Sequence, residues 1–254
     1  MSAKSGMPNF IIAGAPRAGT TWLYHLLDLH PEVYMAKPVR PEPKFFLVDG
    51  SFDRGIEYYS ATWFADLGSA RIAGEKSTNY LESPIVAARI REHLPEVKLI
   101  FILREPADRA FSNYLWSRMN GQEHDDFATA LAAEQQREQS EPSELRYARP
   151  HAYFSRGLYA ELLRPWFDLF QRSQILCLRY DEIITHPLVL AERLHRFLGV
   201  ALRPRDAEKL GVINSSEKDG AVMPEEIRQE LLQRYALPNR RLAQLLGNDF
   251  EVWT

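Results

Sequence analysis

The chain has 254 residues, of which 45% are hydrophobic and 26% charged, and its formal net charge is −3. This composition is typical of a globular protein, and because no linker rich in Gly, Ser or Pro divides it, we expect a single domain over residues 1–254. The small negative charge argues against wholesale binding to nucleic acid, and no stretch reaches the roughly 18–20 apolar residues of a membrane span.

The first predicted elements are a strand, a loop and a helix. The short apolar run 9–13 is rich in β-favouring residues and is followed at once by Gly14, which predicts a buried strand. From Thr20 the apolar residues recur with helical spacing until His30 and Pro31. The loop between the strand and the helix therefore contains Gly14 and Gly19.

Further strands and helices alternate along the chain. We expect strands at 71–74, 97–103 and 175–180, and helices at the ranges 84–94, 106–119, 188–198, 224–235 and 239–246. This alternation predicts an α/β fold of three layers, in which helices flank a central, mostly parallel β-sheet, followed by a C-terminal helical part at about 203–254.

A polar excursion at about 121–150 interrupts the alternation. It is rich in Glu and Gln and contains a possible helix from Asp126 to about Arg137. Two interpretations stay open, a lid or acceptor-binding flap and a solvated helix without a special role.

The single cysteine, Cys177, excludes an internal disulfide. It lies in an apolar run, so it is interpreted as a small buried hydrophobic residue, with a catalytic thiol as the alternative. A reducing compartment suits such a chain, and residues 1–7 lack the apolar stretch of a signal peptide. We therefore expect a cytoplasmic protein.

The loop from Gly14 to Thr21 has the features of an anion site. The first turn of a helix presents backbone N–H groups and the positive end of the helix dipole. The glycine spacing matches the nucleotide-binding P-loop, but Thr20 stands where that motif has lysine, and the cation is Arg17 inside the loop. Such a loop suits a ligand with a single 5′-phosphate and a transferable group better than a triphosphate with its metal, while the alternative is a glycine turn that only joins strand to helix.

A second anion site is predicted from Arg104, at the end of the strand 97–103, and Ser112, about two turns into the next helix. Ligands of open α/β sheets gather at the carboxyl ends of the strands, where an arginine can bind phosphate with charge-assisted hydrogen bonds. A surface ion pair is the alternative for Arg104 alone. Together, two separate anion sites indicate a nucleotide phosphorylated at both ends of its ribose.

These two segments resemble a known family. Residues 14–21 look like the 5′-phosphosulfate loop of sulfotransferases that use 3′-phosphoadenosine 5′-phosphosulfate (PAPS), and residues 103–114 resemble their 3′-phosphate motif; the heparan-sulfate N- and 3-O-sulfotransferases are the most similar type. The resemblance implies a P-loop-like α/β fold, a soluble enzyme, no metal, and in-line transfer that releases adenosine 3′,5′-bisphosphate (PAP). The nucleotide-binding residues that it implies are Arg17, Ala18, Gly19, Thr20, Thr21, Trp22, Arg104, Ser112 and, in a late loop, Lys218.

The resemblance also implies catalytic residues. Glu42 falls on the base of the pattern Glu-x-x-Phe-Phe, Lys76 on a lysine of the same site, and Arg17 on the position that contacts the leaving oxygen. Glu42 would take a proton from the acceptor hydroxyl or amine. The structural alternatives are a solvated loop carboxylate for Glu42 and an ion pair with Glu75 for Lys76.

Other functions remain possible from the sequence alone. The alternatives are a nucleotide or small-molecule kinase on a P-loop scaffold and a non-catalytic PAPS-binding protein. The acceptor is expected to be a saccharide or a small molecule, with no nucleic-acid partner, and the oligomeric state cannot be read from the sequence.

Overall fold

The computed structural model describes residues 6–142, 147–211, 221–247 and 250–253. The chain divides into two compact units, the first made of Met1–Leu103 and Pro165–Ile213 and the second of Arg104–Arg164 and Asn214–Thr254. The expectation of a single domain stays a prediction, and the units are described one by one.

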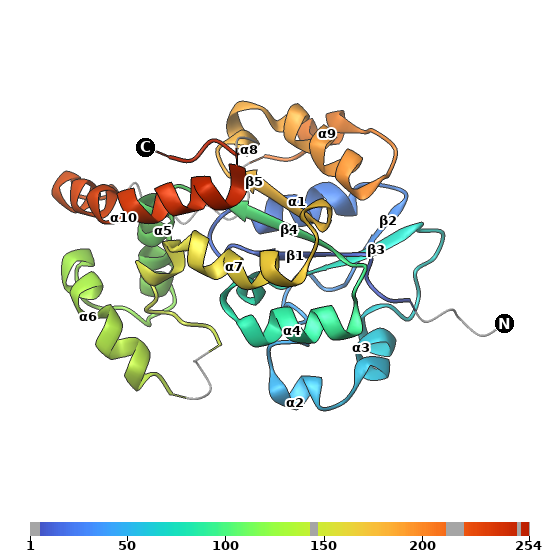
Figure 1. Cartoon of the computed structure of the whole chain (residues 1–254), viewed down its shortest axis with the longest axis horizontal. Coiled ribbons are helices and arrows are strands. Elements are labelled where there is room, and N and C mark those ends of the chain that lie inside the picture. The colour runs from blue at the N-terminus through green and yellow to red at the C-terminus, as the bar shows by residue number, and fades with distance from the viewer. Residues whose placement is uncertain (1–5, 143–146, 212–220, 248–249, 254) are drawn as a thin grey trace. The chain divides into compact units, whose positions relative to one another are not determined.

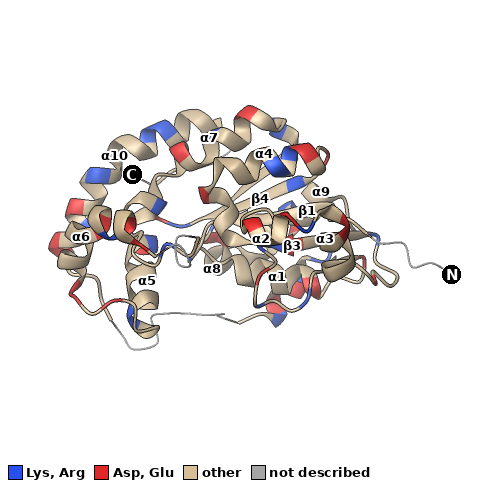
Figure 2. Cartoon of the chain, turned by 90° about the horizontal axis from the view of Figure 1, so that it is seen from below, with Lys and Arg blue, Asp and Glu red and all other residues tan. Residues whose placement is uncertain are grey.

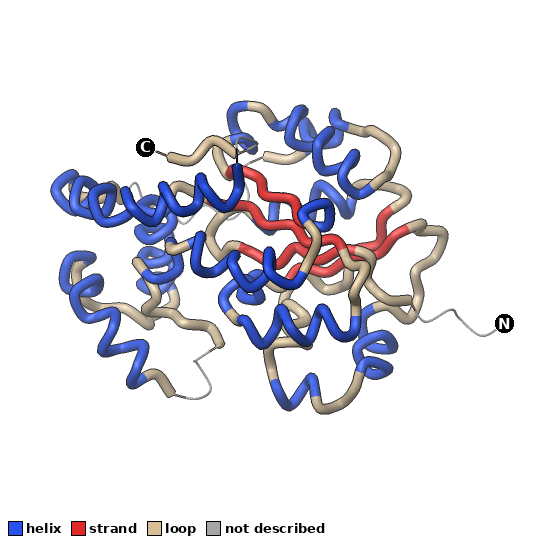
Figure 3. The backbone as a smooth tube through the Cα atoms, viewed as in Figure 1, coloured by secondary structure: helices blue, strands red, loops and turns tan. Residues whose placement is uncertain are grey.

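The first unit is built on a sheet of five parallel strands (Figure 3). The spatial order is β2-β3-β1-β4-β5. The strands are β1 (Phe10–Gly14), β2 (Val33–Met35), β3 (Ile72–Lys76), β4 (Lys98–Leu103) and β5 (Ile175–Arg179). The predicted α/β fold around a parallel sheet is confirmed. Because β1 and β3 are neighbours, the segments that follow them begin at the same edge of the sheet.

Helices cover both faces of this sheet (Figure 1). On one face α1 (Thr20–Asp28) and α9 (Pro187–Leu198) share a buried apolar cluster with Ile100 and Ile102 of β4. Successive strand residues point to opposite faces, and on the other face the Phe101 ring packs edge-on against Trp166 at a centroid distance of 5.3 Å. Burial on both faces explains why β4 reads as a continuous apolar run.

The remaining elements of the first unit are short helices. The α-helices are α2 (Asp49–Phe52), α3 (Ile56–Trp63), α4 (Pro84–His93) and α8 (Glu182–Thr185). The 3-10 helices are η1 (Thr78–Glu82), η3 (Arg172–Gln174) and η4 (Pro204–Lys209). The predicted start of α4 is confirmed, since the Ser83 side chain accepts a hydrogen bond from the Val86 amide at 3.4 Å.

The second unit is helical. It contains α5 (Pro106–Met119), α6 (Phe127–Ser140), the 3-10 helix η2 (Ser155–Gly157), α10 (Glu225–Leu246) and the first part of α7 (Tyr159–Leu169), which continues into the first unit from Pro165. Its core is largely aromatic and includes Phe111, Tyr114, Phe127, Tyr153 and Tyr235. Acidic and basic residues are spread over the helices of both units (Figure 2).

The prediction of separate helices at 224–235 and 239–246 is wrong, because α10 is continuous through Pro238. A proline inside a helix removes one backbone hydrogen bond. Tyr235, Asn239 and Leu242 are nevertheless buried along one helical face on both sides of the proline. The packing of this continuous face explains why the helix persists.

Candidate functional site

The loop that joins β1 to α1 follows a path that needs glycine at position 19. Gly19 precedes α1 with φ of 91°, in the left-handed region that residues other than glycine rarely adopt. A Cβ atom there would lie 2.6 Å from Ile183 Cδ1 and 2.9 Å from Tyr180 Cδ2. The backbone therefore passes directly over these two side chains, which fixes the entry into the helix.

The start of α1 suits a phosphate group. No side chain caps this end of the helix and no acidic residue lies in its first turn. Amide donors of a first turn have no partner within the helix, so an external anion can use them. Thr20 and Thr21 begin the helix, and Arg17, with φ of 66°, lies in the loop before it. The loop thus combines backbone donors, hydroxyl groups and a cation.

Two other residues predicted in the loop have their side chains in the protein interior. Ala18 is fully buried, and Trp22, which is 4% exposed, packs in the apolar cluster beneath α1. The Trp22 amide donates to the Gly19 carbonyl at 2.9 Å. Their prediction as nucleotide-binding residues stays a prediction.

Glu42 and Lys76 lie together, although 34 residues separate them along the chain. The Lys76 ammonium donates to Glu42 Oε1, and the two side chains are 2% and 13% exposed. Thr78 completes the group, with its amide 3.1 Å from Glu42 Oε2 and its hydroxyl 3.2 Å and 3.3 Å from the two carboxylate oxygens. Glu42 is therefore an enclosed, fully partnered carboxylate, and the lysine pairs with Glu42 in preference to its chain neighbour Glu75.

This cluster adjoins the phosphate loop. A Cβ atom on Gly14 would lie 3.2 Å from the Thr78 carbonyl oxygen and 2.7 Å from Leu81 Cβ. The Ser77 amide donates to the Ile12 carbonyl at 3.1 Å. The loop thus begins against the residue that holds Glu42, so the three predicted catalytic residues come from adjacent segments at one edge of the sheet.

Sequence reasoning missed Thr78 as part of the site. The only signal was its position two residues after Lys76, which the resemblance assigns to the site. A threonine after a strand is common, and nothing in the sequence pattern joins it to Glu42.

The predicted 3′-phosphate ligands lie in the second unit. Arg104 follows the last residue of β4, and its carbonyl accepts a hydrogen bond from the Tyr159 hydroxyl at 2.9 Å. Ser112 lies in α5 and is 2% exposed. The start of α5 is capped by Glu105, which accepts from the amides of residues 107 and 108 at 3.0 Å and 2.8 Å. Joint binding of a phosphate by Arg104 and Ser112 stays a prediction, and Lys218 lies outside the described residues.

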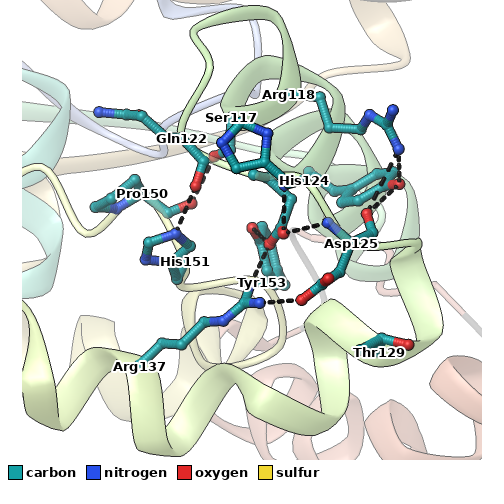
Figure 4. Close-up of polar contacts among 12 residues, drawn as sticks. Ser117, Arg118, Gln122, His124, Asp125, Thr129, Arg137, Pro150, His151 and Tyr153 are labelled. Carbon is teal, nitrogen blue, oxygen red and sulfur yellow. Dashed lines mark hydrogen bonds and ion pairs between the residues drawn. The ribbon is translucent and has the colours of Figure 1, made fainter.

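The excursion is packed into the second unit by polar contacts, most of them partly buried (Figure 4). Arg137 of α6 forms ion pairs with Glu123 and Asp125, and Glu123 also accepts from the Tyr153 hydroxyl at 2.7 Å. The ring nitrogens of His151 lie 2.9 Å from a Glu141 oxygen and from the Gln122 carbonyl oxygen. The helix predicted here is therefore partly buried against the rest of the unit, while a role as a lid stays a prediction.

Cys177 lies inside β5 and is buried. Burial raises the pKa of its thiol to about 12, so the thiol keeps its proton near neutral pH. This environment agrees with a packing role and gives no support to a catalytic thiol.

Two kinds of feature are absent from the described residues. No helix there combines the length and the apolar character needed to cross a bilayer. Among the same residues, no group of three or more His, Cys, Asp or Glu side chains is arranged to hold a metal ion.

Comparison with known proteins gives one family. A family model described as "Sulfotransferase domain" matches residues 7–216. The human bifunctional heparan sulfate N-deacetylase/N-sulfotransferase 2 is 30% identical over 200 residues, which cover 76% of this chain and 22% of that protein. Mouse carbohydrate sulfotransferase 15 is 26% identical over an alignment of 311 positions, and the alignment includes 97% of this chain and 54% of that protein. The chain thus spans about a fifth of the N-deacetylase/N-sulfotransferases that it matches.

Solved structures give the same fold. A sulfotransferase from Alicyclobacillus acidocaldarius superposes with a TM-score of 0.78 at 28% identity, over 96% of this chain and 98% of that one. A mouse sulfotransferase complexed with PAP superposes with a TM-score of 0.61 at 13% identity, over 97% of this chain and 88% of that one.

Proposed function

Since the chain belongs to the sulfotransferase domain family, we propose that it transfers a sulfuryl group from PAPS to a hydroxyl or amine of a glycan or small molecule and releases PAP. The observation that carries the proposal is the enclosed contact of Glu42 with Lys76 and Thr78 beside the phosphate loop. PAPS carries an activated sulfuryl group on its 5′-phosphate. The backbone amides, hydroxyl groups and arginine of the loop suit these two anionic groups.

The family match disfavours the kinase alternative. A kinase of the P-loop type needs a lysine where this chain has Thr20, and a metal ion to hold its triphosphate. PAPS has a single 5′-phosphate, and we propose that it is bound by Arg17, Gly19, Thr20 and Thr21. Arg104 and Ser112 are proposed to bind the 3′-phosphate.

Glu42 is proposed as the general base. Its carboxylate accepts hydrogen bonds from the Lys76 ammonium and from the amide and hydroxyl of Thr78. It would remove the proton of the acceptor as the acceptor attacks sulfur in line with the leaving oxygen. Arg17 and Lys76 would then stabilise the negative charge that grows on the leaving group and on the sulfuryl oxygens.

A saccharide is the proposed acceptor. Support comes from the names of the relatives, which act on heparan sulfate or are called carbohydrate sulfotransferases. A cytoplasmic location is proposed as well, and the single buried cysteine supports it.

The test is the substitution Glu42→Gln. The assay follows PAP release from PAPS with heparan sulfate stripped of its N-substituents as the acceptor and, in parallel, with water as the acceptor. A positioned base contributes roughly 10²–10⁴-fold, so kcat should fall by that factor while the Kd for PAP stays within twofold. Glu57→Gln, on an exposed residue of α3, is the matched control and should behave as wild type.

Two outcomes contradict the proposal. If Glu42→Gln lowers kcat by less than tenfold, Glu42 is not the base. If the wild type binds PAP but transfers the sulfuryl group to neither acceptor, the chain is better described as a PAPS-binding protein.

A further inference from the structure

Glu75 is a buried carboxyl group that the proposed mechanism does not use. It lies on β3 next to Lys76 and is fully buried. The Ser77 hydroxyl donates to Glu75 Oε2 at 3.1 Å, while Oε1 has no hydrogen-bond partner among the described residues. Burial raises the pKa of this carboxyl to about 7, and the charge of Glu42 adds to the effect, while the nearby hydroxyl groups oppose it. A buried, incompletely partnered carboxyl group costs stability, so its presence calls for a reason.

The hydroxyl groups around Glu75 hold the segment that carries the proposed base. Ser77 Oγ, which donates to Glu75, accepts a hydrogen bond from the Lys44 amide at 2.9 Å. The Tyr80 hydroxyl accepts from the Phe46 amide at 3.2 Å. Residues 42–46 are therefore anchored at two backbone amides, and both anchors lie beside the buried carboxyl.

Aromatic packing closes the same region. The ring of Phe45 stacks on Tyr59 of α3 with a centroid distance of 4.6 Å, and Phe46 packs edge-on against Tyr80 at 6.1 Å. Both phenylalanines are buried. The segment has little freedom to move while these contacts last, so a change at Glu75 would reach it directly.

The two phenols that interact with Glu75 do not change charge near neutral pH. Tyr59 from α3 and Tyr80 from η1 interact with the carboxylate, and burial raises the pKa of both phenols well above the ordinary range. Lys76 points to the opposite side of β3 and pairs with Glu42. Among Glu75, Tyr59 and Tyr80, Glu75 is thus the residue that gains or loses a proton near neutral pH.

We propose that Glu75 is a positioning residue whose carboxylate form orients the Ser77 hydroxyl and thereby fixes residues 42–46, so that Glu42 stays over Lys76 and Thr78. When the carboxylate accepts a hydrogen bond from the Ser77 hydroxyl, the lone pairs of Ser77 Oγ face the Lys44 amide. A protonated Glu75 can donate to the same oxygen and compete with that amide. Turnover should therefore rise as Glu75 loses its proton. The proposal rests on the proposed role of Glu42 as the base.

The test is the pH profile of kcat for Glu75→Gln, which keeps the shape of the side chain and cannot ionise. PAP release from PAPS is measured between pH 5.5 and 9, with the stripped polysaccharide and with water as acceptors. In the wild type kcat should rise through the region of pH 7. In Glu75→Gln this rise should vanish, and kcat at pH 8 should fall roughly tenfold, because small displacements of a catalytic group are costly, while PAP affinity stays unchanged.

A second variant and a control separate positioning from general damage. Ser77→Ala cuts the link between Glu75 and Lys44 and should also flatten the profile. Glu92→Gln, on an exposed residue of α4, should keep the wild-type profile.

The outcomes distinguish this proposal from the one on which it rests. Glu75→Gln or Ser77→Ala with the wild-type rate and profile would overturn the positioning role, even if Glu42→Gln is inactive. Wild-type turnover in Glu42→Gln would instead overturn the proposed base. A wild-type profile that shows no rise near pH 7 would also contradict the role of Glu75.

Discussion

Replacement of Gly19 by alanine tests whether the backbone of the phosphate loop is as constrained as the structure shows. A side chain at φ of 91° lies in the left-handed region, which costs about 1–2 kcal/mol. The new Cβ would lie 2.6 Å from Ile183 Cδ1 and 2.9 Å from Tyr180 Cδ2, so these groups must shift, and overpacking of this kind costs about 1–3 kcal/mol. Gly19→Ala should therefore lower the free energy of unfolding by roughly 2–5 kcal/mol.

Urea denaturation at pH 7 without nucleotide measures this loss, and calorimetry measures the Kd for PAP, which should rise. Gly50→Ala is the matched control, because Gly50 lies in α2 without a positive φ and with no atom within 4 Å of the added Cβ. The control should keep its stability or gain slightly, as alanine is favoured in helices. If the two variants differ by less than about 0.5 kcal/mol, the claim that the loop requires glycine is refuted.

Four further substitutions test other contacts. Burial lowers the pKa of His195 from 6.5 to about 4, so between these pH values the unfolded chain binds a proton that the folded chain does not bind. In urea titrations the free energy of unfolding should therefore fall by roughly 3 kcal/mol from pH 6.5 to pH 4, and by less in His195→Gln. The raised pKa of Glu75 has the opposite effect on the pH dependence of stability, because its contribution is lost as the pH rises from 4.5 to about 7. Relative to the wild type, Glu75→Gln should therefore be more stable at pH 8 than at pH 5 in the same titration. Thr78→Val removes the hydroxyl from the Glu42 carboxylate and should lower kcat about fivefold in the PAP-release assay without changing the Kd for PAP. Glu134→Ala leaves two amides without their acceptor and should lower the free energy of unfolding by about 2–4 kcal/mol; an unchanged urea midpoint would show that these contacts contribute little.

The parts of the fold that could be predicted are those with a strong local pattern in the sequence. β4 and α4 were placed to within a few residues, because an apolar run and a Ser-Pro start are local signals. β2 was missed, since three residues are too few to show alternation. The continuous α10 was missed because Pro238 is a local breaking signal, while the buried face that overrides it depends on the folded core.

The site could be predicted only in part from the residues themselves. The phosphate loop is one continuous segment, so its glycines and hydroxyls could be recognised from their spacing. Glu42 and Lys76 come from segments 34 residues apart, and only the resemblance to a family joined them. Glu75 was considered as the partner of Lys76 because it is adjacent in sequence, but neighbouring residues of a strand point to opposite faces. The same alternation places Glu75 in the buried cluster that supports residues 42–46.

The central claim is that one doubly phosphorylated adenosine is bound at both of its phosphate ends, and its most direct test compares PAP with adenosine 5′-monophosphate, which lacks the 3′-phosphate. Calorimetry without Mg²⁺ should show that the wild type prefers PAP by at least about tenfold, and that Arg104→Ala combined with Ser112→Ala removes this preference while leaving the affinity for the monophosphate unchanged. Equal affinity of the wild type for the two nucleotides, or a full preference for PAP in the double variant, would contradict the account.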